Sequence, residues 1–455
     1  MALRDLRANL LAAISTKKGY LAHNEESLDI YNGNLQPYVD KILKQTLSDN
    51  YYNKIKHRSV PINILKRYAD KTSKAYETAP QRLTDAKYQQ TIDYYTRSLS
   101  LNMVMNKADD YSTLFKGYLL EPYIHMGKPK ARIIPYDRFL PYSTDEVDPT
   151  YPTVIVKFMG KKSITVKGKA QVRDIYFSYS NEEFDAFDDQ GDDFLDALQL
   201  NDGVNPLGRI PFVYGNRGND ELIPTQDTDL LQFTKLMPIL MTDLSGAIMF
   251  QCFTIIYGVN VSSENLTMSP NAFWSLKSDP TTQQAPIVGT IKPDVDVDKV
   301  INYIMNAFSF WLETKGIRAG SVGQVNANNV ISGISKLIDE MDATSLIMRS
   351  QVKFSHDEMD LWDLIRMYNN LWLQTGQITT KEKPILMPDD LEVTTQFDEP
   401  QPVTDRRTEV ETARLEVESG FTSRRSAMVK LYPNMSSDQI DEEIKQIDNE
   451  STVIG

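Results

Sequence analysis

The densest group of side chains that could do chemistry is acidic. Eight carboxylates lie between residues 182 and 196, at Glu182, Glu183, Asp185, Asp188, Asp189, Asp192, Asp193 and Asp196. Carboxylates of this kind can hold divalent metals for phosphoryl chemistry. A calcium loop needs Gly at its sixth position, whereas the sixth position counted from Asp185 is Gln190. We therefore expect a solvated hairpin tip, and a metal-dependent nuclease or phosphotransferase that uses the 182–196 carboxylates remains the alternative.

The remaining candidates for chemistry are scattered. The chain has four histidines and one cysteine, Cys252. His356 and Asp357 lie inside a capping-box pattern, Ser355-x-x-Glu358, which predicts a helix that begins here and explains these residues better than a metal site. Phosphate-binding, zinc-protease and nucleophile-elbow motifs are absent from the sequence. The sequence predicts no catalytic residue, no metal and no cofactor.

Length and composition limit the classes of protein. The 455 residues carry 49 Lys and Arg against 62 Asp and Glu, a net charge of −13. At about 100–200 residues per domain, this length suggests several domains. The acidic balance argues against a protein that coats nucleic acid, and a single cysteine excludes an internal disulfide. The most apolar stretch, residues 236–256, contains Asp243 near its middle, so we expect no membrane span.

The hydrophobic pattern changes along the chain from helical to strand-like and back. About the first 120 residues read as helices, with a helix behind Pro61. Short β-branched and aromatic runs broken by Gly and Pro then predict antiparallel strands at residues 131–134, 152–158, 163–167 and 174–179. A long apolar helix is predicted from Asp229 to about residue 253, kinked or divided at Pro238. Together these patterns predict an α+β fold that is predominantly helical.

The second half of the chain reads as long helices separated by loops. Residues 297–315 show the clearest helical spacing, with an Asp before them and Gly after them. The loop at 319–329 carries no charge and is rich in Gly and Asn, and the helix after it is expected to end near residue 354. The capping box at 355–358 predicts a separate helix up to Gly376, and three short helices follow near the C-terminus.

A set of diffuse marks, in this order, resembles the portal proteins of tailed double-stranded DNA bacteriophages over nearly the whole chain. The marks are Tyr-Asn-Gly at 31–33, Val-Pro-Ile-Asn at 60–63, Gly-Arg-Ile-Pro-Phe-Val at 208–213, Asn-Ala-Asn-Asn-Val-Ile-Ser-Gly at 326–333, Phe-Asp-Glu-Pro at 397–400 and Glu-Val-Glu-Ser-Gly at 416–420. No single mark is specific, and the resemblance depends on their order.

The resemblance implies a homo-oligomeric ring, a 12-mer, at one capsid vertex. Its implied partners are double-stranded DNA in the axial channel, the terminase large subunit, a head–tail adaptor, and the major capsid and scaffolding proteins. It places the chain in the virion after assembly in the host cytoplasm, without a membrane. The implied parts are N-terminal helices and wing (1–227), first stem helix (228–250), clip (251–296), second stem helix (297–316), tunnel loop and long helix (317–354), wing return (355–402) and crown (403–455). Another head–tail connector ring is the second alternative, although connectors are generally shorter.

A channel through which DNA slides should offer weak, neutral contacts along most of its length. We therefore expect the uncharged loop to face the DNA through Gln324, Asn326, Asn328 and Asn329. Three basic residues beside this loop are predicted to make transient phosphate contacts: Lys315, Arg318 and Lys336.

A ring also needs heterologous contacts between neighbouring subunits. The two predicted stem helices carry more apolar residues than one thin stem can hide. We expect part of this surface to pack between subunits, through Leu240, Leu244, Ile248, Ile304, Phe308 and Trp311.

Overall fold

The structure is a computed structural model of the whole chain. It describes residues 2–166, 169–194, 203–218, 221–252, 255–259, 287–291, 296–315, 317, 343–381, 384–397, 406–432, 440 and 443–445. The chain divides into two compact units, residues 1–398 and 399–455. The crown was expected from residue 403, close to this division.

Helices dominate the first part of the larger unit. They are α1 (Leu3–Thr16), α2 (Lys18–Tyr31), α3 (Gln36–Thr46), α4 (Asp49–Ile55), the short 3-10 helix η1 (Lys56–Arg58), α5 (Ile64–Thr72), α6 (Ala86–Ser98) and α7 (Leu101–Phe115). α5 begins where the sequence indicated, because the Asn63 side chain accepts a hydrogen bond from the backbone N–H of Lys66. Its predicted apolar face is buried at Leu65 and Ala69.

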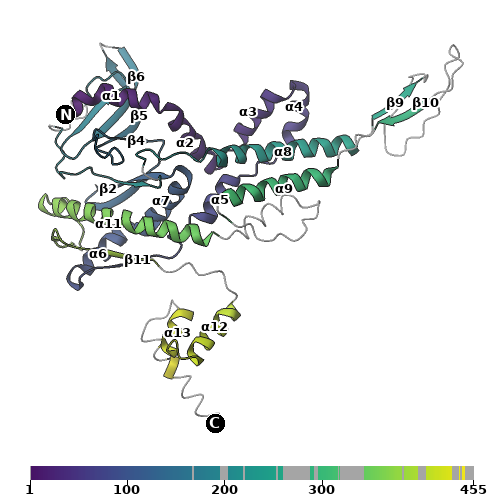
Figure 1. Cartoon of the computed structure of the whole chain (residues 1–455). Helices are drawn as coiled ribbons and strands as arrows, with labels where there is room; N and C mark the ends of the chain where they lie inside the picture. Colours follow the sequence, from purple (N-terminus) through teal and green to yellow (C-terminus); the bar gives the residue numbers. More distant parts are fainter. Residues whose placement is uncertain are drawn as a thin grey trace, which may run out of the picture. The chain divides into compact units, whose positions relative to one another are not determined.

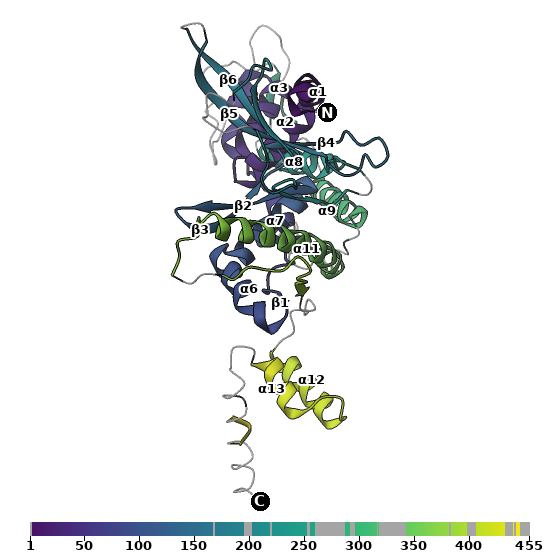
Figure 2. The same ribbon diagram turned by 90° about the vertical axis from the view of Figure 1, so that its left-hand side faces the viewer.

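Two antiparallel sheets follow. One has the order β3-β2-β8, and the other has the order β4-β5-β6-β7. Their strands are β2 (Gly117–His125), β3 (Lys128–Ile134), β4 (Phe139–Tyr142), β5 (Val154–Val166), β6 (Lys169–Tyr179), β7 (Phe184–Asp188) and β8 (Val213–Asn216). The antiparallel strands predicted at 131–134 and 174–179 are confirmed within β3 and β6, whereas the two strands predicted at 152–158 and 163–167 are one strand, β5, with a register shift between Phe158 and Gly160. Helix α1 packs on the four-stranded sheet through Leu3, Leu6 and Leu10 (Figure 2).

Two long helices then form an arm. α8 (Thr228–Cys252) and α9 (Val297–Thr314) lie side by side and run in opposite directions (Figure 1). Between them in the chain, β9 (Ile255–Val259) and β10 (Ile287–Ile291) pair as antiparallel strands. α9 begins as predicted, with the Asp296 side chain accepting from the backbone N–H of Lys299. The first helix was expected to be kinked or divided at Pro238, and the division is wrong, because α8 runs through Pro238 as one helix.

The larger unit is completed by α11 (Thr344–Gln374) and a small two-stranded sheet of β1 (Gln81–Leu83) and β11 (Thr394–Gln396). α11 lies along β2 and β8 (Figures 1 and 2). The sequence predicted one helix that ends near residue 354 and another that begins at the capping box. Instead, α11 passes through residues 354 and 355 without interruption.

The smaller unit contains α12 (Arg406–Glu418) and α13 (Arg424–Leu431). Gly420 follows α12 with a φ of +75°, a left-handed conformation suited to Gly at a helix end. The Ser423 hydroxyl accepts from the backbone N–H of Ser426 and caps α13. The first two predicted C-terminal helices are thus present, and the chain is a mixed α+β protein, as expected.

Candidate functional site

The arm is held together by stacked aromatic rings. Phe233 of α8 lies against Trp311 of α9, with ring centroids 5.2 Å apart and planes inclined by 4°. The Phe308 ring stacks on both, at 5.7 Å from Phe233 and 5.9 Å from Trp311. The Trp311 indole N–H also donates to Asp229 Oδ2 at 3.1 Å. Because stacked and hydrogen-bonded aromatic residues pack in a fixed geometry, this contact sets the register of the two helices.

Six side chains on the two helices of the arm were expected to contact a neighbouring subunit. Four of these side chains are already buried inside one chain: Leu244, Ile304, Phe308 and Trp311. A side chain that is packed within its own subunit has little surface left for a neighbour, so the burial of these four weighs against their place in a subunit interface, which stays a prediction. Of the other two, Leu240 is half-buried and Ile248 is 40% exposed.

Two aromatic residues on the outer face of α9 were missed. Tyr303 and Phe310 are each 68% exposed and lie two helical turns apart. They fall outside the apolar stripe of α9 that the sequence identified as its buried face. Large aromatic side chains off the core stripe were the signal in the sequence, and they form an exposed apolar surface on α9.

Lys315 does not lie free at the end of the arm. Its ammonium group contacts Asp227, and it lies 2.8 Å from Asp229. Lys116 adds a second cation 3.5 Å from Asp227. Hydrogen bonds from Asp227 and Lys315 hold the pKa of Asp229 well below its usual range. These contacts within the chain weigh against a phosphate contact of Lys315, which stays a prediction.

The other predicted channel residues lie outside the described residues. They are Arg318, Gln324, Asn326, Asn328, Asn329 and Lys336.

The acidic segment is only partly the solvated tip that the sequence predicted, because Glu182, Asp189, Asp192 and Asp193 are exposed but two other carboxylates are not. Asp185 and Asp188 belong to β7 and are each 1% exposed. Arg7 of α1 donates to both carboxylate oxygens of Asp185 at 2.7 Å. Arg173 of β6 lies 3.1 Å from Asp188. The two carboxylates thus join α1 and β6 to β7. The pairing of Asp185 with Arg7 was not predictable from a local pattern, because the two residues lie 178 positions apart in the sequence.

The capping-box interpretation is also wrong, because Ser355 lies in the middle of α11. Its hydroxyl donates to the carbonyl of Gln351 at 3.0 Å. Asp357 contacts two distant residues instead of capping a helix. Arg217 Nη2 lies 2.7 Å from Asp357 Oδ2, and the Tyr118 hydroxyl donates to the same oxygen at 2.6 Å.

Glu358 forms a second buried network on α11. Arg82 donates to it through Nε at 2.7 Å and through Nη2 at 2.6 Å. The hydroxyls of Tyr76 and Thr395 each donate at 2.9 Å. The Glu358 and Arg82 side chains are 0% and 4% exposed. These bidentate bonds fix the axial position of α11 relative to β1 and β11.

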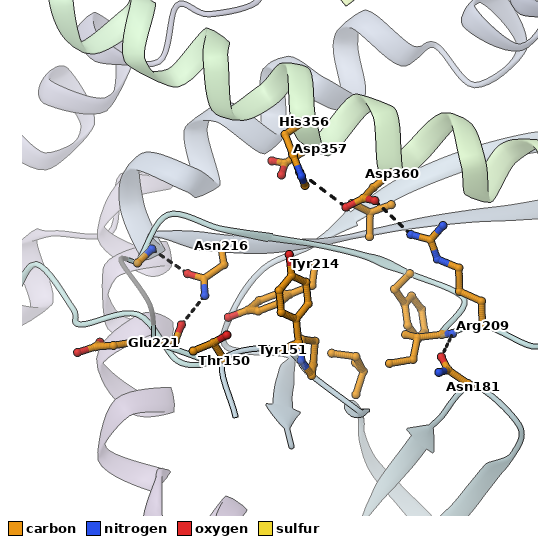
Figure 3. Close-up of a pocket in the computed structure, with 16 residues that line it drawn as sticks. Thr150, Tyr151, Asn181, Arg209, Tyr214, Asn216, Glu221, His356, Asp357 and Asp360 are labelled. Atoms are coloured by element: carbon orange, nitrogen blue, oxygen red, sulfur yellow. Dashed lines mark hydrogen bonds and ion pairs between the residues drawn. The ribbon is translucent and has the colours of Figure 1, made fainter. Parts of the chain in front are cut away.

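A pocket of about 400 Å³ lies beside α11 (Figure 3). Its walls come from the segment before and within β8, the loop around Tyr151, and α11. Arg209 and Asp360 lie at one end, and Glu221 lies at the other. Tyr214 stands between them, with its hydroxyl donating to the carbonyl of Leu222 at 2.6 Å.

Nothing in the described part of the chain groups three or more His, Cys, Asp or Glu side chains in a geometry suited to a metal ion. Within the same ranges, no helix has the length and hydropathy needed to cross a membrane. No protein-family model matches the sequence, and no curated protein matches it.

Proposed function

We propose that the chain is a phage portal protein, a ring-forming subunit that surrounds a DNA channel at the capsid vertex. The ring would serve DNA packaging and ejection, and would dock the terminase large subunit and a head–tail adaptor. The support comes from the order of the elements. An antiparallel helical arm, α8 and α9, flanks a strand pair, and a small helical unit closes the chain. This order agrees with the stem, clip and crown that the sequence resemblance implies.

The observation that carries the proposal is a set of exposed apolar side chains on the outer face of the arm, among the residues that the structure describes. The inner contact of the two helices is filled by Phe233, Phe308 and Trp311. Tyr303 and Phe310 remain 68% exposed on α9, and Leu236 remains 45% exposed on α8. Exposed aromatic residues are typical of protein interfaces. In a ring, the α9 face of one subunit can meet a different face of the next, which is the heterologous contact that closes it.

The DNA-contacting part of the proposal rests on the sequence. Gln324, Asn326, Asn328 and Asn329 supply neutral hydrogen-bonding groups, and Arg318 and Lys336 supply the phosphate contacts. We leave Lys315 out of the proposed phosphate contacts, because its ammonium group is paired with Asp227 and Asp229.

The alternative of a metal-dependent nuclease gains no support from the acidic segment. Its two buried carboxylates, Asp185 and Asp188, are paired with Arg7 and Arg173. A metal would have to displace a guanidinium group from each of them. The other alternative, a different connector ring, would be distinguished from a portal by particle symmetry and by the presence of a wing and a crown.

The proposal is tested by placing a charge on the outer face of the arm. We expect Phe310→Asp to abolish the ring, because an interface cannot bury an unpaired carboxylate without a large cost. Sedimentation velocity measures the loss, and circular dichroism shows that the released subunit is folded. Met103→Asp is the matched control, since Met103 is 71% exposed on α7, away from the arm. A Phe310→Asp protein that keeps the wild-type ring would contradict the proposal.

A further inference from the structure

The pocket beside α11 lies along a strand edge that has no partner. β8 is the outer strand of its sheet and pairs with β2 on one side only. Among the described residues, no other strand pairs with it. Val213, Tyr214 and Asn216 of β8 also line the pocket. An extended peptide can add to such an edge through main-chain hydrogen bonds, with its side chains entering the neighbouring pocket.

The walls of the pocket suit alternating side chains of an added strand. The side chains of Ile210, Phe212 and Tyr151 supply apolar and aromatic surface. Tyr151 is 67% exposed, so its ring is available to cover a ligand. Figure 3 shows Tyr151 and Tyr214 between the two charged ends of the pocket. This arrangement favours an extended segment that places apolar side chains along the floor.

The charge of the pocket favours a basic ligand. Asp360 of α11 has two ion-pair partners, Arg209 Nη2 at 3.5 Å and His356 Nδ1 at 3.9 Å. Both distances exceed an ordinary N–H···O hydrogen bond, so its oxygens keep capacity to accept one from a ligand. Glu221, at the opposite end, is exposed. Among the lining residues, the carboxylates of Asp360 and Glu221 face one guanidinium group, that of Arg209, and His356 adds positive charge only when it is protonated. Asp357 is paired with Arg217, so the pocket has an excess of negative charge when His356 is neutral.

We propose that this pocket is a peptide-binding groove in which an extended segment of a partner protein adds to the edge of β8 and places a Lys or Arg side chain on Asp360. The inference goes beyond the ring and does not depend on it, because every group it uses belongs to one chain. Strand addition supplies affinity through the backbone, and Asp360 supplies the preference for a basic residue.

The groove can be tested on the full-length protein with short blocked peptides. The probe is a library with a central Arg, flanked by Val, Ile, Thr and Tyr, and binding is followed by methyl NMR at Ile210 and Ile155, which line the pocket. We expect both methyl signals to shift. A library with a central Glu should bind at least about tenfold more weakly, as expected for the loss of a hydrogen-bonded charge pair. A library with Pro beside the Arg should also bind more weakly, because Pro removes a backbone donor.

Variants on α11 separate the groove from non-specific binding. Asp360→Asn should weaken the Arg library about tenfold. Asp363→Asn should leave it unchanged, since Asp363 is 51% exposed on the same helix and is not among the residues that line the pocket. Equal binding of the Arg and Glu libraries, or no shift at either methyl group, would overturn the proposal. Loss of the ring in Asp360→Asn would show that a neighbouring copy fills the groove and would overturn it as well.

Discussion

Replacing Glu358 by Gln tests how strongly the buried network holds α11. The substitution keeps the shape of the side chain and removes its charge. Glu358 accepts four hydrogen bonds, two from Arg82, one from Tyr76 and one from Thr395. After the substitution, Arg82 stays buried at 4% exposure without a counter-charge.

The expected cost follows from that uncompensated charge. Removing one partner of a buried ion pair destabilises proteins by about 3–5 kcal/mol. Gln retains one oxygen that can still accept from Arg82 or a hydroxyl, so we expect a loss near the lower end, about 3 kcal/mol. Replacing both residues, Arg82→Met with Glu358→Leu, removes both charges and should cost less than the sum of the two single substitutions.

Urea unfolding followed by tryptophan fluorescence measures these losses. Protein concentrations must be matched, because ring assembly adds to apparent stability by mass action. Glu77→Gln is the control, since Glu77 pairs with Lys74 at the surface, where the side chains are 64% and 33% exposed. We expect it to cost less than about 1 kcal/mol. If Glu358→Gln costs no more than this control, the network does not hold α11 in place.

Three further predictions concern single residues. Burial raises the pKa of Asp109 to about 7, so the folded chain keeps a proton that the unfolded chain releases above about pH 4. Stability should therefore fall as pH rises from about 4 to 7, by up to about 1.4 kcal/mol per pH unit, and urea unfolding of Asp109→Asn should lack this slope. Gly215→Ala should lower stability in the same assay by about 1–3 kcal/mol, because the new Cβ would lie 2.3 Å from the buried aromatic side chain of Tyr118. An unchanged unfolding midpoint would show that the Tyr118 side chain can move aside at no cost in stability. Lys315→Gln should leave the salt dependence of DNA binding unchanged, because Asp227 already pairs with this lysine; a lost phosphate contact would instead reduce the slope of log K against log salt by about 0.9.

Local signals in the sequence predicted the elements that depend on neighbouring residues. α9 was predicted from its apolar spacing and from Asp296, which caps the helix through a residue three positions away. The antiparallel strands were predicted from β-branched runs separated by Gly, and β5 and β6 pair as successive strands. These elements are set by contacts close in the chain, which a pattern can capture.

The errors concern residues whose partners are far away in the chain. Ser355 and Glu358 have the spacing of a capping box. The same spacing can occur at the start of a helix or in its middle, so the pattern alone does not show which of the two is present. Glu358 pairs with Arg82, 276 residues earlier. Asp185 pairs with Arg7, 178 residues earlier. A local pattern does not identify such a partner, so Glu358 was interpreted as part of a helix cap, and the buried Asp185 was included in a solvated tip that is exposed only at its other carboxylates.

The candidate interface was predicted only in part for a related reason. An apolar stripe shows which face of α9 is buried, but it does not show whether the burial is against the same chain or another copy. Phe308 and Trp311 are buried against the same chain, whereas Phe310 lies on the opposite, exposed face.

Electron microscopy of the purified full-length protein tests the central claim most directly. We predict class averages of closed rings with an axial hole, in which the α8–α9 arms of neighbouring subunits contact each other. A particle population that consists only of monomers, with Tyr303 and Phe310 facing solvent, would contradict the proposed function.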